Sequence, residues 1–282
     1  LLSYRNLPYL TPKQATGFGV LREIGAFDVN VHVEENRIVG QVKNNTLYSY
    51  EQAYIEVGLQ RIPIGALKKG EEKQIDGAVE ALFMPRDQLQ AEADSPEKRR
   101  KEMQENAIGY GQGGQVRLIG ITTDPIPLMK MQEPHQAYYW NVVNQTVQLK
   151  PQENGNVVMP YGLLNVDLLE TTGDYDSING YLWQLGKGSI TFELRTDMTN
   201  LDLKRLLVPL DHSSYRPFRV EYFHQKSGKW RMVDRGTKLV LDRELPNALT
   251  GNHTLLLRFS NDGPSRLSLP VPFFQVEGVR KW

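Results

Sequence analysis

Apolar and polar residues alternate with a period of two in many short segments of this chain. Residues 28–33 read Asp-Val-Asn-Val-His-Val, and residues 37–46 resume the alternation after a short acidic turn. Successive side chains of a strand point to opposite faces, so this pattern is typical of a half-buried β-hairpin and not of a helix. The pattern recurs as far as the C-terminus. It therefore predicts an all-β fold.

In the first half, the opening hairpin is followed by segments that alternate in the same way, at residues 53–57, 61–67, 74–83 and 115–121. Pro63 cannot donate a hydrogen bond to a sheet ladder, so its segment is expected at a sheet edge or at a crossing between sheets. Gly40 inside a strand indicates either a bulge or a close approach of two backbones.

One helix is expected between strands of the first half, near residues 95–107. Ser95 can cap it, Pro96 suits the first helical position, and Glu97 lies four residues before Lys101. Few large apolar residues occur in this segment. We therefore expect an inserted surface helix, with a basic docking surface as the alternative.

The second half predicts eight strands, at residues 138–149, 166–170, 189–195, 205–210, 218–224, 230–233, 254–260 and 267–276. Eight strands suit a jelly-roll-like β-sandwich. Between the halves, several prolines favour a short semi-rigid linker. The expected organisation is a β-sandwich with the inserted helix at residues 1–124, a linker at 125–134 and a jelly-roll-like β-sandwich at 135–282.

Two motifs distinguish the sandwich expected at residues 1–124. Residues 40–46 read Gly-Gln-Val-Lys-Asn-Asn-Thr, and residues 64–71 read Ile-Gly-Ala-Leu-Lys-Lys-Gly-Glu. Their order resembles the bacterial immunoglobulin-like module of the FxLYD kind, in which these segments read G-x-V-x-N-x-T and x-G-x-L-x-x-G-E. The resemblance implies a cell-surface setting and no catalytic residues. The second half resembles ectodomains of uncharacterised Gram-positive membrane-anchored proteins, which implies no activity.

Composition narrows the partners and the compartment. The 33 Lys and Arg residues balance 33 Asp and Glu residues, so no positive field favours nucleic acid. No stretch approaches the ~20 apolar residues that span a bilayer, so we expect any membrane anchor outside this sequence. The chain has no cysteine, which excludes disulfides and thiolate metal sites. We expect an extracytoplasmic protein, anchored at the bacterial cell surface.

No motif specifies a chemistry. The five histidines are scattered singly, and neither an H-E-x-x-H motif nor a G-x-S-x-G elbow occurs. Ser213 and Ser214 lie beside His212, which we interpret as a polar turn. Carboxylate pairs for a glycosidase are available in any chain this acidic, and nothing selects one pair. We therefore predict no catalytic residues and no enzymatic activity.

Two candidate binding sites remain. Asp174, Asp176 and Asn179 fall in one short segment with a glycine, which would suit a calcium ion if the segment were a loop; the alternative is an ordinary turn. Exposed aromatic residues could bind a glycan, and the alternative is that they pack in the core. The aromatic candidates are Trp140, Tyr181, Trp183, Tyr222 and Trp230.

The function expected from the sequence is protein binding or scaffolding by a non-enzymatic ectodomain. The alternative is a glycan-binding or cell-wall-binding module, and a glycosidase-type hydrolase ranks third. The partner is then a protein or a cell-wall glycan, with no nucleic acid and no required cofactor. Calcium is the one metal that the sequence suggests.

Overall fold

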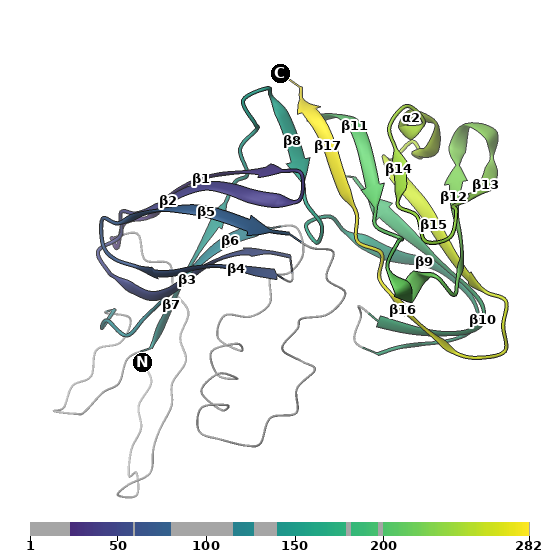
Figure 1. Ribbon diagram of the computed structural model, residues 1–282, viewed down its shortest axis with the longest axis horizontal. Coiled ribbons are helices and arrows are strands. Elements are labelled where there is room, and N and C mark those ends of the chain that lie inside the picture. The colour runs from purple at the N-terminus through teal and green to yellow at the C-terminus, as the bar shows by residue number, and fades with distance from the viewer. Residues whose placement is uncertain are drawn as a thin grey trace, which may run out of the picture.

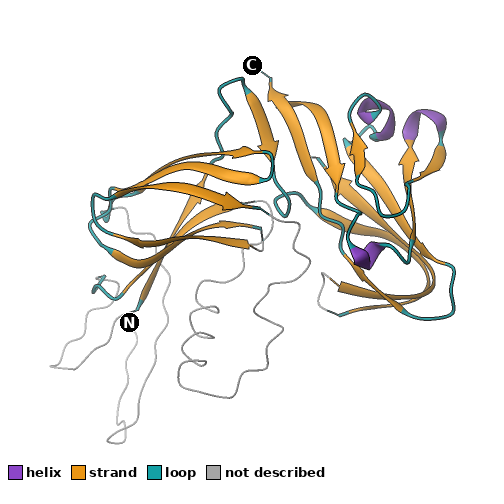
Figure 2. Cartoon of the chain, in the orientation of Figure 1, coloured by secondary structure: helices purple, strands orange, loops and turns teal. Residues whose placement is uncertain are grey.

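The computed structural model describes residues 23–58, 60–79, 115–126, 140–178, 182–196 and 200–281. Nearly all of the regular secondary structure in this part is strand, and the helices are short turns (Figure 2). Four antiparallel sheets form two β-sandwiches that lie side by side (Figure 1). The prediction of an all-β sandwich fold is confirmed. The helix expected near residues 95–107 lies outside the described residues.

The first sandwich contains a three-stranded and a four-stranded sheet, in the orders β1-β2-β5 and β4-β3-β6-β7. The strands of the smaller sheet are β1 (Phe27–Glu34), β2 (Arg37–Asn44) and β5 (Glu72–Ala78). The strands of the larger sheet are β3 (Tyr50–Val57), β4 (Gln60–Leu67), β6 (Val116–Thr122) and β7 (Asn141–Val147).

Alternate apolar side chains of both sheets make one core. Val31, Ile38, Val42, Ile55 and Leu118 are fully buried in it, as the period of two predicts. Truncating one such aliphatic side chain to alanine typically costs about 2–5 kcal/mol. This core holds the first sandwich together without a disulfide.

The Asn-x-Thr element of the FxLYD-like motif has a structural role. Asn44 Nδ2 donates to Tyr48 O at 2.8 Å and to Leu67 O at 3.2 Å. Its Oδ1 accepts from the backbone N–H and the hydroxyl of Thr46, at 3.0 and 2.7 Å. Both side chains are buried. The motif therefore ties the end of β2 to β4, since an unpaired buried amide would be costly.

Gly40 and Pro63 lie where the sequence predicted. A Cβ at Gly40 would lie 2.1 Å from Asn30 O, so β1 and β2 approach too closely for any other residue. The ladder keeps its register there, so the feature is a close approach and not a bulge. Pro63 lies on β4, which is the edge strand of its sheet.

The sheet pairing corrects the expected place of one strand. Sequence analysis assigns the strand around residues 138–149 to the second sandwich, but β7 pairs with β6 along its whole length. Gln145 also exchanges two hydrogen bonds of 2.8 Å with the backbone of Phe27. Strands of the first sandwich therefore continue to Val147, well past the proline-rich segment. Alternation alone does not reveal the partner of a strand.

The second sandwich packs a six-stranded sheet on a four-stranded sheet. The six-stranded sheet has the order β13-β12-β15-β10-β16, with β9 paired to β10, and the other sheet has the order β14-β11-β17-β8. The strands are β8 (Asn156–Met159), β9 (Val166–Ser177), β10 (Leu182–Arg195), β11 (Leu201–Val208), β12 (Arg219–His224), β13 (Lys229–Met232), β14 (Leu239–Leu241), β15 (Thr254–Asn261), β16 (Leu267–Pro270) and β17 (Gln275–Arg280). The one described α-helix is the short α2 (Leu245–Ala248).

Aromatic rings form the centre of the second core. Phe259 makes edge-on contacts with Phe192 and Phe218, at centroid distances of 5.9 and 6.2 Å, and packs on Tyr215 at 5.4 Å. The Tyr215 hydroxyl donates to Val271 O at 3.2 Å, so its polar end is satisfied. Burial raises the pKa of Tyr215 well above its usual value. Ring pairs of this kind stabilise the fold beyond the contribution of the apolar area that they bury.

The two sandwiches are joined by packing and by hydrogen bonds. Gln152 Nε2 donates to Val33 O at 2.7 Å, and Gln275 Nε2 donates to Glu35 O at 3.1 Å. Leu163 packs in the first core, and Met159 packs against both. These contacts restrict hinge motion at the junction. The described helices include none that is long and apolar enough to cross a membrane.

Candidate functional site

The most distinctive surface is the edge strand β9 of the second sandwich. Among the described strands, β9 pairs with β10 alone, along almost its whole length of 12 residues (Figure 1). Its other edge therefore offers backbone N–H and C=O groups to a further strand. Edge strands of this length are usually shortened or covered, because they template pairing with other chains.

Exposed apolar side chains gather on and beside this edge. Of the seven large hydrophobic residues that are exposed in the described part of the chain, four are Leu168, Leu169, Tyr175 and Ile178. Leu169 is 52% exposed and Tyr175 is 40% exposed, although Tyr175 also contacts the ring of Trp183 at a centroid distance of 6.0 Å. Such a concentration at one edge indicates an interaction surface.

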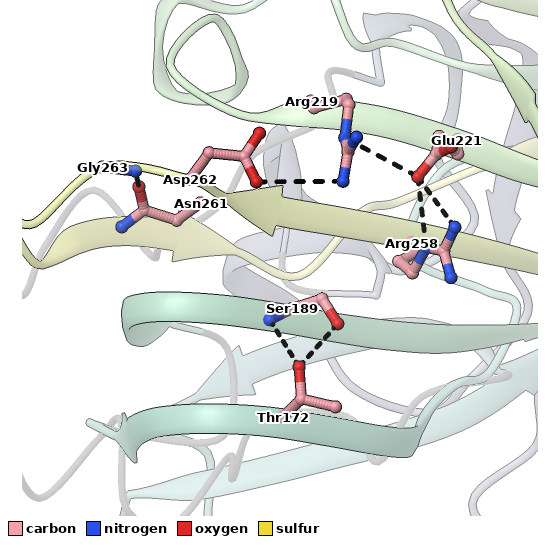
Figure 3. A network of polar contacts seen from close by, with 8 residues as sticks. All are labelled: Thr172, Ser189, Arg219, Glu221, Arg258, Asn261, Asp262 and Gly263. Atoms are coloured by element: carbon pink, nitrogen blue, oxygen red, sulfur yellow. Dashed lines mark hydrogen bonds and ion pairs between the residues drawn. The ribbon is translucent and has the colours of Figure 1, made fainter.

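Close packing fixes the position of β9. A Cβ at Gly173 would lie 2.1 Å from Lys187 O, and a Cβ at Gly188 would lie 2.1 Å from Thr172 O. Beside these glycines, Ser189 donates its backbone N–H to Thr172 Oγ1 at 3.0 Å, and the two hydroxyls are 2.9 Å apart (Figure 3). The edge is therefore held firmly on its paired side.

The residues that we expected to form a calcium loop belong to this strand. Asp174 and Asp176 lie within β9, and both bind the guanidinium of Arg266. Arg266 Nη1 is 2.6 Å from Asp176 Oδ2, and Arg266 Nε is 3.1 Å from Asp174 Oδ2. These hydrogen bonds raise the pKa of Arg266 above its usual value. The prediction of a loop at Asp174 and Asp176 is wrong; Asn179 lies outside the described residues.

The strand conformation places both carboxylates on the same side of β9. Asp174 and Asp176 are two residues apart and therefore share one face, where the single guanidinium of Arg266 reaches both. Within the described ranges, no group of three or more His, Asp or Glu side chains is arranged to hold a metal ion.

The outer face of the same sheet carries a charged network (Figure 3). Glu221 Oε2 accepts from Arg258 Nε and Nη2 at 3.2 and 2.9 Å. Arg219 lies 3.8 Å from both Glu221 and Asp262. The Arg258 guanidinium also stacks over the ring of Trp230, 4.0 Å from its centroid. The Arg258 guanidinium therefore covers one face of the Trp230 ring, a face on which a sugar would otherwise stack.

The predicted aromatic candidates do not form a common surface. Tyr222 is buried in the second core, and Trp183 packs partly buried against it. Trp230 lies on the outer face under Arg258, with its edge against Phe223 at 5.4 Å. Trp140 packs against Ile119 and Ile121 of the first sandwich. Tyr181 lies outside the described residues.

One polar cluster was missed by the sequence analysis. His224 Nδ1 is 2.8 Å from Ser227 Oγ, and His224 Nε2 is 3.1 Å from Glu244 Oε2. The chain of contacts resembles a Ser-His-acid triad with the two ring nitrogens exchanged. The signal His-x-x-Ser is too short to be specific, and nothing in the sequence relates it to Glu244.

The surroundings of this cluster identify it as a turn cap. The backbone N–H of Ser227 donates to His224 Nδ1 at 3.3 Å, and that of Gly228 donates to Gln225 O at 3.1 Å. The two N–H groups nearest the hydroxyl are therefore already used, and neither is free to stabilise an oxyanion. His212 caps its own turn similarly, through Ser214 N at 3.2 Å.

Comparison with known proteins adds one match. Residues 26–150 match a family described as a domain of unknown function, DUF8725. The matched range coincides closely with strands β1 to β7, and thus with the first sandwich as the sheet pairing defines it. No curated protein matches the chain. The fold and this match together define an all-β protein whose first sandwich is similar to that family of unknown function.

Proposed function

We propose that the protein is a non-enzymatic binding module at the bacterial cell surface, which holds an extended segment of a partner protein as an added strand on β9. The observation that carries the proposal is the long edge of β9 with its exposed leucines. In strand addition, main-chain hydrogen bonds supply affinity and alternate side chains supply specificity.

The energetics of such binding are adequate. Each added main-chain hydrogen bond contributes about 0.5–1.5 kcal/mol net, so five or six of them give measurable affinity when apolar contacts accompany them. The receiving strand is already ordered by its ladder with β10, so little conformational entropy is lost on this side.

The cell-surface part of the proposal has separate support. The chain lacks cysteine, and its FxLYD-like motif suggests a surface setting. Attachment to a membrane would then involve segments outside this sequence. Whole-cell labelling with a membrane-impermeant amine reagent tests the location; labelling only after lysis would contradict it.

Strand addition is tested with an array of nine-residue peptides of β-forming sequence, covering basic, neutral and acidic compositions, together with cell-wall glycans. We expect at least one class of peptide to bind the full chain and to bind Leu169→Ser at least threefold more weakly. Leu47→Ser is the matched control, because Leu47 is exposed to a similar degree on the first sandwich.

The outcomes separate the function classes. Absence of binding by every peptide, or binding that Leu169→Ser does not weaken, would contradict strand addition at β9. Binding of a glycan that is lost in Trp230→Ala would support the alternative glycan-binding function instead.

A further inference from the structure

The chemistry of the partner strand can be read from the two faces of β9. Resting on the function proposed above, we infer that β9 receives a strand in which basic residues alternate with apolar residues. The basic side chains would lie on the outer face of the sheet, and the apolar side chains on the face that continues the core.

The register with β10 assigns the faces. Thr171 and Tyr175 lie opposite Ile190 and Leu185, which are fully buried, so they share the core-facing side. By alternation the outer side carries four residues of this stretch. These residues are Glu170, Thr172, Asp174 and Asp176.

The outer row keeps a negative charge. Three of its members are carboxylates, and Arg266 supplies one positive charge to Asp174 and Asp176. Three negative charges and one positive charge leave an excess of two negative charges. Glu170 is exposed and takes part in no described ion pair. Opposite charges directly across an antiparallel pair stabilise the pairing.

The core-facing side of the edge is apolar. Leu168 lies opposite the buried Phe192, and Tyr175 leans on Trp183, but both remain more than a third exposed. An added strand would cover these side chains with its own alternate residues. Apolar side chains there continue the core by one strand, which is favoured by the area that they bury.

The same charges disfavour a second copy of the chain as the occupant. A two-fold antiparallel pairing of β9 with itself keeps outer residues on the outer face, whatever the register. Glu170, Asp174 and Asp176 would then face one another or Thr172. Like charges directly opposite are destabilising, whereas a basic strand relieves the repulsion.

Two register shifts mark where regular pairing along β9 is disturbed. The ladder shifts between Thr191 and Phe192 of β10, where Leu169 is an extra residue on β9, and again between Leu185 and Gly188 of β10, beside the left-handed Gly173 of β9. Bulges interrupt regular pairing on both sides of a strand. Residues 170–172 and 174–176 therefore remain regular beside these irregularities; they contain the three carboxylates, and Leu169 borders them.

Three labelled nine-residue peptides test the inference, in which valine alternates with lysine, serine or glutamate. Fluorescence anisotropy with the full chain measures their dissociation constants at low and high salt. We expect the lysine peptide to bind most tightly and to weaken with salt. Glu170→Lys should weaken it by about two- to fivefold and should strengthen the glutamate peptide. Glu153→Lys, an exposed site outside β9, should change neither.

Failure of the inference is distinguishable from failure of the proposed function. If the serine or glutamate peptide binds as tightly as the lysine peptide, and Leu169→Ser weakens that binding, strand addition stands and the basic partner is wrong. If neither Leu169→Ser nor Glu170→Lys changes the dissociation constant of the lysine peptide, the peptide binds elsewhere and both proposals fail. Concentration-dependent dimers that Glu170→Lys changes would identify a second copy as the occupant.

Discussion

Two sheet edges of this protein, β4 and β9, are protected in different ways. Both strands contain a left-handed glycine, Gly65 or Gly173, and two register shifts against a neighbouring strand, but β4 also has Pro63, whose nitrogen cannot donate to another strand. β9 is longer and has no proline, and it is protected by three carboxylates. A backbone device excludes every incoming strand, whereas charge excludes only strands of like charge. The difference suggests that β9 accepts or rejects an incoming strand according to its charge, and that β4 accepts none.

The largest expected effect separates two edge glycines that have nearly the same backbone angle. Gly65 has φ +79° and no atom within 4 Å of the place where a Cβ would lie, whereas Gly173 has φ +83° and Lys187 O only 2.1 Å from that place. We expect Gly65→Ala to cost about 1–2 kcal/mol, from the left-handed backbone alone. Gly173→Ala should cost about 2–5 kcal/mol in total, because a backbone clash is added.

Urea unfolding of both variants measures this difference. Binding of the lysine peptide should be lost in Gly173→Ala and kept in Gly65→Ala. Equal destabilisation of the two variants would mean that β9 can move away from β10 at little cost, and that the edge is less firmly held than its packing indicates.

The second prediction removes the charge that keeps copies apart. The combined change Glu170→Thr, Asp174→Asn and Asp176→Asn leaves the exposed leucines and the open backbone edge in place. We expect this variant to self-associate, since a long apolar edge without charge is a template for its own copy. Sedimentation equilibrium measures the effect. A variant that stays monomeric at concentrations where the peptide binds wild type would show that charge is not what protects β9.

Alternation in the sequence was sufficient to predict the all-β class, while single residues limited Pro63 to a sheet edge or a crossing and Gly40 to a bulge or a close approach. These depend on the period of two and on the chemistry of single residues. The partner of each strand could not be predicted, because pairing depends on contacts between segments far apart in the chain. β7 is the clear example, since its pattern is that of any strand but its ladder is with β6.

The candidate site was misread for a related reason. The Asp, Asn and Gly residues at 174–180 favour a turn locally, but Arg266 supplies a guanidinium from about 90 residues away and accommodates two of the acids in a strand. Tertiary context overrides such local preferences. The exposure of Leu169 was not identified from the sequence either, since alternation places one of the adjacent Leu168 and Leu169 outward without indicating which.

The third prediction tests what Arg266 contributes to the charge along β9. Arg266→Gln leaves Asp174 and Asp176 unneutralised on one face of β9. The pair is exposed, so we expect only a small loss of stability. Affinity for the lysine peptide should rise, because the outer row becomes more negative. Arg243→Gln is a control on an exposed arginine remote from β9. A fall in affinity would mean that Arg266 itself contacts the peptide.

The smallest expected effect concerns the opposite edge of the same sheet. Arg231 of the edge strand β13 and His224 of the adjacent β12 both bind Glu244, at 3.4 and 3.1 Å, so this edge has paired charges where β9 has an excess. The hydrogen bond from His224, and to a lesser degree the charge of Arg231, hold the pKa of Glu244 below its usual value of 4.5. The protonated form is therefore disfavoured in the folded state.

Because the pKa of Glu244 is lower in the folded state than in the unfolded state, its charge stabilises the fold at pH values above the unfolded-state pKa of 4.5. This contribution is lost as the pH falls through the lower folded-state pKa. Glu244→Gln should remove this part of the acid-induced destabilisation, so the melting temperatures of variant and wild type should converge below pH 4.5. Glu153→Gln is the matched control and should leave the pH profile unchanged. A difference between Glu244→Gln and wild type that stays constant from neutral to acid pH would show that the Glu244 charge is not linked to folding, and that β13 is secured by packing alone.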